Sequence, residues 1–194
     1  MSPNRLATGF AALAIILSLG LAGCSSPTTG TAPPEESEAA EVAEEEEAPA
    51  ADEGTRENPF PIGTVIESDE WTVVVNSVNL DGNEAVAGAN QFNEPPTEGS
   101  QYIVVNYTAT YTGDDPDGQI AAFVTVDYVT ASGTTVDAMS SIAVAPEPAI
   151  DTMSPLYNGG TASGNKVILV PSPPDGVLAI SAGMMADKVF SAIQ

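Results

Sequence analysis

Hydrophobic and polar side chains alternate most regularly between residues 102 and 111. A period of two places alternate side chains on opposite faces of a β-strand, so this stretch predicts a strand with one face in a core. The inward set is Ile103, Val105, Tyr107, Ala109 and Tyr111, and the outward set is Tyr102, Val104, Asn106, Thr108 and Thr110.

The segment that begins at Trp71 predicts a second strand, over residues 71–80, in which the phase changes. The odd-numbered apolar residues from Trp71 to Val75 share one face, whereas Val78 and Leu80 lie in the opposite phase. An extra residue in a strand moves the following side chains to the other face. The pattern therefore predicts a β-bulge near Asn76 and Ser77.

Several other short runs are rich in β-branched residues and are bounded by residues that favour turns. We expect strands at residues 64–67, 120–130, 140–144, 166–170, 177–181 and 188–193, with turns at 131–134 and 158–160. In the strand at 120–130 the expected buried face is Ala122, Val124, Val126 and Tyr128. About seven to nine short strands with little helix predict an all-β fold, an antiparallel β-sandwich.

Residues 81–100 lack strand character, and 20 residues are long for a plain loop in a compact domain. The stretch 84–90 favours a short helix, although Gly88 weakens it. Pro95 and Pro96 then force the chain to extend before the strand at 102. The sandwich is therefore expected to carry one short helical insert.

Residues 1–23 have the three parts of a secretory signal peptide. Arg5 is the only charge ahead of an apolar core at residues 10–19, which is shorter than the about 20 residues of a membrane-spanning helix. The sequence Leu-Ala-Gly-Cys that ends at Cys24 resembles the lipobox of bacterial prolipoproteins. That resemblance implies lipidation of Cys24 by diacylglycerol; an ordinary signal followed by a chance cysteine is the alternative.

Residues 24–57 contain mostly Ser, Thr, Pro, Ala and Glu, with four consecutive glutamates at 44–47. Low hydrophobicity and high charge predict a disordered acidic linker ahead of a domain at residues 58–194. At roughly 3.3 Å per residue, the linker has a limiting reach of about 100 Å. A helix over residues 35–51 and a binding role for the acidic tract are the alternatives.

The composition is strongly acidic: 27 Asp and Glu stand against 4 Lys and Arg, for a net charge of −23. Such a surface repels nucleic acids, so nucleic-acid binding is excluded. Basic proteins, cations and neutral glycans remain as partners. The one cysteine is assigned to lipid, so we expect no disulfide framework and a core that is stable without crosslinks.

The absence of histidine excludes histidine-dependent catalysis and histidine metal sites. Because the one cysteine is assigned to lipid, cysteine metal sites are excluded as well. Lys166 and Lys188 occupy strand-like positions, where a solubilising edge charge is the common role. Paired carboxylates for glycoside hydrolysis remain an alternative, but so small a domain lacks the long loops of a sugar cleft. We therefore expect a protein that is not an enzyme and that has no catalytic residues and no cofactor.

The densest group of carboxylates is Asp114, Asp115 and Asp117, followed by Gly118. Clustered carboxylates are suitable ligands for Ca²⁺. The spacing does not match an EF-hand loop, and Asp-Pro and Asp-Gly are ordinary turn residues. A turn is the preferred interpretation, and a Ca²⁺ site is the alternative.

Large apolar side chains in expected loops form another group of interest. Methionine and aromatic residues suit adaptable binding surfaces, but they more often close the ends of a sandwich core, which we prefer here. The group is Phe92, Met153, Tyr157, Met184 and Met185.

Four stretches of residues 54–194 carry a resemblance to a known family: GTRENPFPIG, WTVVV, ANQFNEPPTEGSQY and VVNYTATYTGD. With the lipobox, they resemble small actinobacterial lipoproteins that have a telokin-like, immunoglobulin-like extracellular domain, sometimes called the immunoprotective domain. The resemblance implies an immunoglobulin-like sandwich outside the cell. A few phage-encoded relatives are linked to exclusion of other phages, but no residue for that effect can be placed here.

These observations together predict a lipoprotein held on the outer face of the cell membrane by Cys24. Its domain is expected to be a monomeric, non-catalytic interaction or envelope-protection module for an extracellular protein or envelope component. A small-ligand or Ca²⁺-binding accessory lipoprotein of a transporter or sensor is the alternative.

Overall fold

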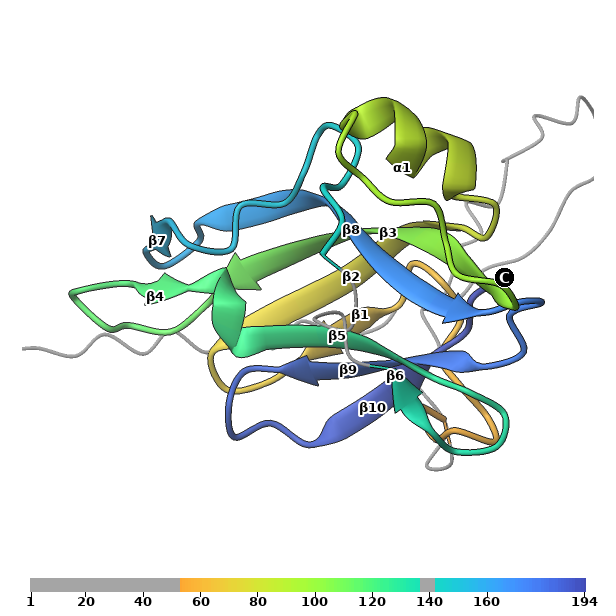
Figure 1. The fold of residues 1–194 in the computed structure, drawn as a ribbon. Coiled ribbons are helices and arrows are strands. Elements are labelled where there is room, and N and C mark those ends of the chain that lie inside the picture. The colour runs from red at the N-terminus through yellow and green to blue at the C-terminus, as the bar shows by residue number, and fades with distance from the viewer. Residues whose placement is uncertain (1–52, 137–141) are drawn as a thin grey trace, which may run out of the picture. The chain divides into compact units, whose positions relative to one another are not determined.

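Two four-stranded antiparallel sheets face each other across a shared hydrophobic core (Figure 1). The computed structural model describes residues 53–136 and 142–194, all of which fall within one compact unit. The first sheet has the order β1 (Val65–Glu67), β2 (Trp71–Asn79), β3 (Ser100–Tyr111) and β8 (Thr161–Pro171). The second has the order β10 (Lys188–Ser191), β9 (Val177–Ala182), β5 (Val124–Val129) and β6 (Thr135–Val136).

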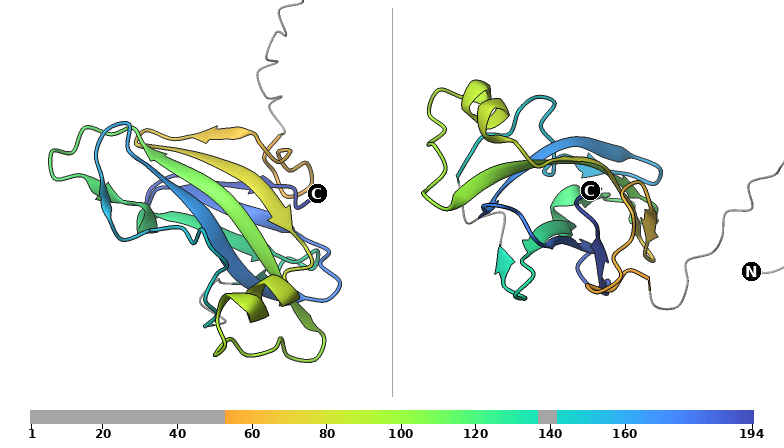
Figure 2. Two further views of the ribbon diagram at one scale, coloured as in Figure 1. Left: turned by 90° about the horizontal axis from the view of Figure 1, so that it is seen from above. Right: turned by 90° about the vertical axis from the view of Figure 1, so that its right-hand side faces the viewer.

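Four small elements complete the described residues. β4 (Gln119–Ile120) pairs with β7 (Pro155–Leu156), the 3₁₀ helix η1 is Ala121–Phe123, and the α-helix α1 is Asn83–Ala89. The predicted antiparallel β-sandwich with one short helical insert is thus confirmed (Figure 2). The described residues contain ten strands rather than the predicted seven to nine. Part of the difference is the pair β4 and β7, whose strands of two residues are too short to produce an alternating pattern.

β3 is one of the two inner strands of the first sheet, and its predicted inward face is confirmed. The odd-numbered side chains from Ile103 to Tyr111 are at most 1% exposed. The ring of Tyr111 packs against that of Trp71, with centroids 5.1 Å apart and planes tilted by 55°. This aromatic pair closes the core where β2 begins and β3 ends.

The predicted bulge in β2 is also confirmed. The register between β2 and β3 shifts between Val75 and Ser77. Beyond the shift, Val78 and Leu80 pack against the same core as Val75. One extra residue therefore keeps both apolar sets on the inner face.

The outward face of β3 is only partly open to solvent, because α1 covers one part of it (Figure 2). Val86 of α1 packs against Tyr102 and Val104 of β3 and Val167 of β8, and all four are buried. This packing explains why the outward set begins with two apolar residues and continues with polar ones. The helix exists despite Gly88 because it buries Val86.

The predicted strand at 120–130 is wrong in its first part. Residues 121–123 form η1, and the strand proper begins at Val124. Val124, Val126 and Tyr128 are buried as expected, but Ala122 is exposed. Its backbone N–H donates to Thr152 O at 2.9 Å, so this segment bonds to the region before β7 instead of extending β5.

The predicted strand at 140–144 is not found in its described part, residues 142–144. The backbone of Val144 bonds instead to the side chain of Asn93, which accepts from Val144 N at 2.8 Å and donates to Val144 O at 2.9 Å. Nearby, Asn165 N of β8 donates to Pro148 O at 2.7 Å. Prolines at 146 and 148 cannot donate to a ladder, which limits this segment to single bridges.

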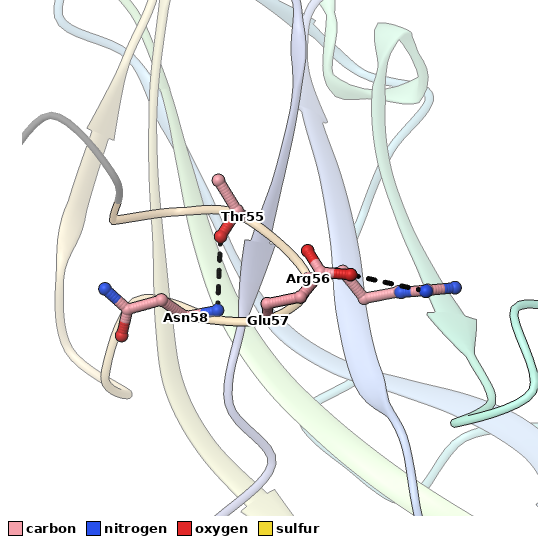
Figure 3. Close-up of polar contacts among 4 residues, drawn as sticks. All are labelled: Thr55, Arg56, Glu57 and Asn58. Atoms are coloured by element: carbon pink, nitrogen blue, oxygen red, sulfur yellow. Dashed lines mark hydrogen bonds and ion pairs between the residues drawn. The ribbon is translucent and has the colours of Figure 1, made fainter.

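The described chain begins with residues that are bonded to β10. Gly54 O accepts from Phe190 N at 2.8 Å, and Gly54 N donates to Asn58 O at 2.9 Å. Within this turn Asn58 N donates to Thr55 Oγ1 at 3.1 Å, and Arg56 pairs with Glu57 at 3.3 Å (Figure 3). The last residues of the expected linker, 53–57, thus belong structurally to the sandwich.

Candidate binding site at one end of the sandwich

A pocket of about 580 Å³ lies at the end of the sandwich where β2 begins and where β3 and β9 end. The loops at this end are on the left in Figure 1, and α1 is at the opposite end. We call this hollow the Trp71 pocket. Its lining is Ser68, Asp69, Glu70, Trp71, Gln119, Phe123, Ala182, Gly183, Met184, Met185 and Ala186.

Trp71 lines this pocket and is only 1% exposed. Gly183 covers one edge of the indole: a Cβ added to Gly183 would lie 3.1 Å from Trp71 Cδ1. Gly183 also has φ of +111°, a conformation that favours glycine. Among the described residues, the indole N–H has no hydrogen-bond acceptor.

Ser68 connects two walls of the pocket that come from different sheets. Its hydroxyl donates to Ala182 O of β9 at 2.6 Å and accepts from Trp71 N at 3.1 Å. The turn that carries Asp69 and Glu70 is thereby fixed to the end of β9. The acidic side and the methionine side of the pocket hence have a defined spacing.

Met184 and Met185 form the wall between β9 and β10 and are 73% and 96% exposed. Phe92, Met153 and Tyr157 are also largely exposed. The preferred interpretation, that these five side chains close the ends of the core, is therefore wrong. The ends are filled instead by residues on the strands, such as Trp71 and Tyr111.

The charged residues that line the Trp71 pocket are both acidic. Asp69 and Glu70 follow Ser68 in the turn before β2, and both are exposed. The basic residues of the described chain are Arg56, Lys166 and Lys188, and the pocket lining includes none of them. The pocket therefore combines apolar walls with a negative rim.

The aspartates at 114, 115 and 117 lie on the turn that precedes β4. Asp115 Oδ1 accepts from Asp117 N at 2.9 Å, and Asp115 Oδ2 accepts from Gln119 Nε2 at 2.7 Å. Gly118 N donates to Asp115 O at 3.0 Å, with φ of +72° at Gly118. These bonds give Asp115 a structural role in the turn, while the side chain of Asp114 is exposed.

Neither a metal centre nor a membrane-spanning helix emerges from the residues that the structure describes. Across residues 53–136 and 142–194, no three Asp, Glu, His or Cys side chains converge to hold a metal ion. Over the same ranges, no helix has the length and hydropathy needed to cross a bilayer. Cys24, the signal peptide and most of the linker lie outside the described residues.

A second hollow, of about 570 Å³, is lined by residues of β5, of β8 and of the segment 142–152. Tyr107 of β3 lines it, and burial raises the pKa of this tyrosine to about 12. The Tyr107 hydroxyl has no hydrogen-bond partner among the described residues. Apolar side chains such as Val124 and Ile150 supply much of the remaining lining.

Lys166 lies at the same hollow and bridges the two sheets. Its Nζ donates to Val126 O of β5 at 2.9 Å. The expected role as a solubilising edge charge is therefore wrong for Lys166. Lys188, in the edge strand β10, is exposed as that role requires.

The exposed loop before β7 is ordered by a carboxylate. Asp151 accepts hydrogen bonds from the hydroxyl and backbone N–H of Ser154 and from the backbone N–H of Met153. These donors lower the pKa of Asp151. The bonds fix the backbone beside the exposed side chain of Met153.

Comparison with known proteins gives likenesses of fold and no family. No family model matches the chain. No curated protein matches it either. Among solved structures, the chain is similar to an uncharacterized β-sandwich protein from Clostridium difficile, at 14% identity over 70% of this chain and 94% of that one, with a TM-score of 0.41. It is also similar to a conserved hypothetical protein from Bacillus anthracis, at 19% identity over 68% and 94% of the two chains, with a TM-score of 0.45.

Sequence reasoning missed most of the residues that form the Trp71 pocket. The sequence marks Met184 and Met185 as candidates, but no local pattern connects Ser68, Asp69 and Phe123 with them. The signal that was available is the Ser-Asp-Glu turn directly before the single tryptophan of the chain. The proximity of that turn to residues 183–186 depends on the pairing of the sheets, which local patterns do not contain.

Proposed function

We propose that the protein is a lipid-anchored lipoprotein of the outer face of the cell membrane and that its sandwich is a non-catalytic interaction module. The partner is an extracellular protein or an envelope component. The observation that carries this proposal is the Trp71 pocket, where Met184 and Met185 are exposed beside a fixed acidic turn. Contiguous exposed apolar surface with a polar rim is typical of interaction sites.

The anchoring part of the proposal is supported by the sequence Leu-Ala-Gly-Cys at residues 21–24. Each buried methylene of an acyl chain contributes about 0.8 kcal/mol to membrane binding, so two or three chains give a stable anchor. Replacement of Cys24 by serine removes the thiol that accepts the lipid. We expect Cys24→Ser to appear in the medium instead of the membrane fraction, measured by fractionation and immunoblotting.

Retention of Cys24→Ser in the membrane fraction would contradict the anchor. The matched control is Ser25→Ala, which leaves the thiol in place and should remain with the membrane. The interaction itself is tested by chemical crosslinking on whole cells that express the full chain. A reproducible neighbour outside the cell supports the module, and its absence with the wild-type chain would contradict it.

Small-ligand binding is a second candidate function, favoured by the hollow between β5 and β8. The hollow is large enough for a small molecule, and the buried Tyr107 is among its lining residues. A Ca²⁺-binding variant of this function has less support, because both carboxylate oxygens of Asp115 already accept hydrogen bonds. Native mass spectrometry of protein purified from its own host would detect a retained ligand or metal.

A further inference from the structure

We infer that the Trp71 pocket binds a basic, apolar peptide segment of a partner protein, an inference that rests on the proposed interaction function. The first argument is charge. Asp69 and Glu70 form the rim, and no basic residue lines the pocket. A cationic side chain of a partner would complement this rim, whereas an acidic partner or an anionic lipid surface would be repelled.

The second argument is the shape and chemistry of the walls. Met184 and Met185 are flexible, polarizable side chains that are largely exposed, and Phe123 of the 3₁₀ helix η1 lines the same pocket. Methionine-rich walls adapt to leucine-like side chains of a bound peptide. A segment that alternates basic and apolar residues would contact the rim and these walls together.

The third argument is an unused hydrogen-bond donor. Trp71 is almost fully buried, it lines the pocket, and its indole N–H donates to no acceptor among the described residues. A buried donor without a partner is uncommon in folded proteins. A backbone carbonyl of a bound peptide could accept a hydrogen bond from this indole N–H, for which the described part of the chain supplies no acceptor.

The test measures the binding of a defined peptide to the full-length chain. The probe is a short, fluorescently labelled peptide in which lysine and leucine alternate, and anisotropy reports binding. Trp71 is the only tryptophan, so its emission independently reports events at the pocket. Two control peptides, one with glutamate for lysine and one with serine for leucine, separate the charge and apolar contributions.

The expected result is saturable binding of the lysine–leucine peptide with a change in Trp71 emission. The serine control should bind about tenfold more weakly or worse, because it cannot bury apolar surface against Met184 and Met185. The double variant Met184→Ala/Met185→Ala should weaken binding of the lysine–leucine peptide by at least about tenfold. Phe92→Ala, an exposed apolar residue at the opposite end, should bind like the wild type.

A charge-matched pair of variants excludes a general attraction to an acidic protein. Asp69→Asn/Glu70→Gln should weaken binding, while Glu94→Gln/Glu98→Gln, which removes the same charge near α1, should not. Equal weakening by both pairs, or no binding of the lysine–leucine peptide, would overturn the inference. Thermal melting of every variant confirms that the fold is retained.

The inference and the proposed function fail in different ways. If the Met184→Ala/Met185→Ala chain still captures the wild-type neighbour in whole-cell crosslinking, the peptide site is wrong and the interaction module stands. If the wild-type chain captures no neighbour at all, the interaction module is wrong. Capture of a neighbour by the wild type and its loss in the methionine variant supports both.

Discussion

Two buried tyrosines show how the same residue type has different roles within one core. The hydroxyl of Tyr128 accepts from the backbone N–H groups of Asp175 and Gly176 at 2.8 and 2.6 Å. It thereby ties the loop before β9 to β5. The hydroxyl of Tyr107, on β3, has no such partner among the described residues, although this side chain is equally buried.

Removal of the two hydroxyls should therefore change the free energy of unfolding by different amounts at neutral pH. Tyr128→Phe removes the acceptor of two partly buried hydrogen bonds and should lower the free energy of unfolding by about 1–3 kcal/mol. Tyr107→Phe removes an unpartnered hydroxyl and should leave stability within about 0.5 kcal/mol of wild type, or raise it. Urea denaturation measures both, and a larger loss for Tyr107→Phe than for Tyr128→Phe would contradict this assignment.

The raised pKa of Tyr107 also predicts how stability depends on alkaline pH. Burial raises its pKa from 10.0 to about 12 in the folded protein, so the unfolded chain loses this proton first as the pH rises. The stabilisation is complete below pH 10 and is lost as the pH approaches about 12. The loss for this one group is about 1–3 kcal/mol.

Urea unfolding at a series of alkaline pH values tests this dependence. Tyr107→Phe should lose less stability over this range than the wild type, because it removes the buried group that titrates. Tyr157→Phe, at an exposed position, is the control and should follow the wild type. Identical pH profiles for wild type and Tyr107→Phe would contradict the prediction.

At the scale of elements, α1 shows how one buried side chain maintains a short helix. The helix has seven residues, and its N-cap, Gly82, makes no side-chain capping bond. Isolated helices of this length are unstable in water. Packing of Val86 on Tyr102, Val104 and Val167 supplies the stabilisation that the local sequence does not.

Val86→Ala should therefore destabilise the protein by about 1–3 kcal/mol through lost apolar burial. The expected accompanying change is greater exposure of Tyr102, observed as faster hydrogen exchange at this end of β3. Val65→Ala makes the same chemical change at a side chain that is 51% exposed and should cost much less. Equal costs for the two substitutions would show that α1 does not depend on this contact.

At the scale of the whole molecule, uncompensated negative charge is the main electrostatic feature. The net charge of the chain is −23. Within the described residues, Arg56 forms an ion pair with its neighbour Glu57. Repulsion among carboxylates destabilises a compact state, and salt screens that repulsion. The pocket rim at Asp69 and Glu70 adds to this negative surface.

Sodium chloride should therefore stabilise the fold. Between low and physiological ionic strength, the free energy of unfolding in urea should rise by an amount on the order of 1 kcal/mol. A neutral solute at equal osmolality is the control and should have a smaller effect. A decrease in stability with salt would show that attractive ion pairs outweigh the repulsion.

The sequence by itself determined most of the strands, the inward faces of β2 and β3, the bulge after Val75 and the existence of a short helix. Each of these follows from the spacing of apolar residues along a few consecutive positions, which is a local property. The charge of the chain and the lipobox at Cys24 are likewise read directly from residues. The lipobox leads to a prediction about location that the described residues do not test.

Only the tertiary structure decided which loops lie together. Ser68 and Ala182 are 114 positions apart in the chain, and their hydrogen bond exists because β2 begins and β9 ends at the same end of two facing sheets. The same pairing brings Met184 and Met185 beside Trp71 and leaves them exposed. Burial of such residues depends on distant partners, so periodicity along the chain cannot predict it.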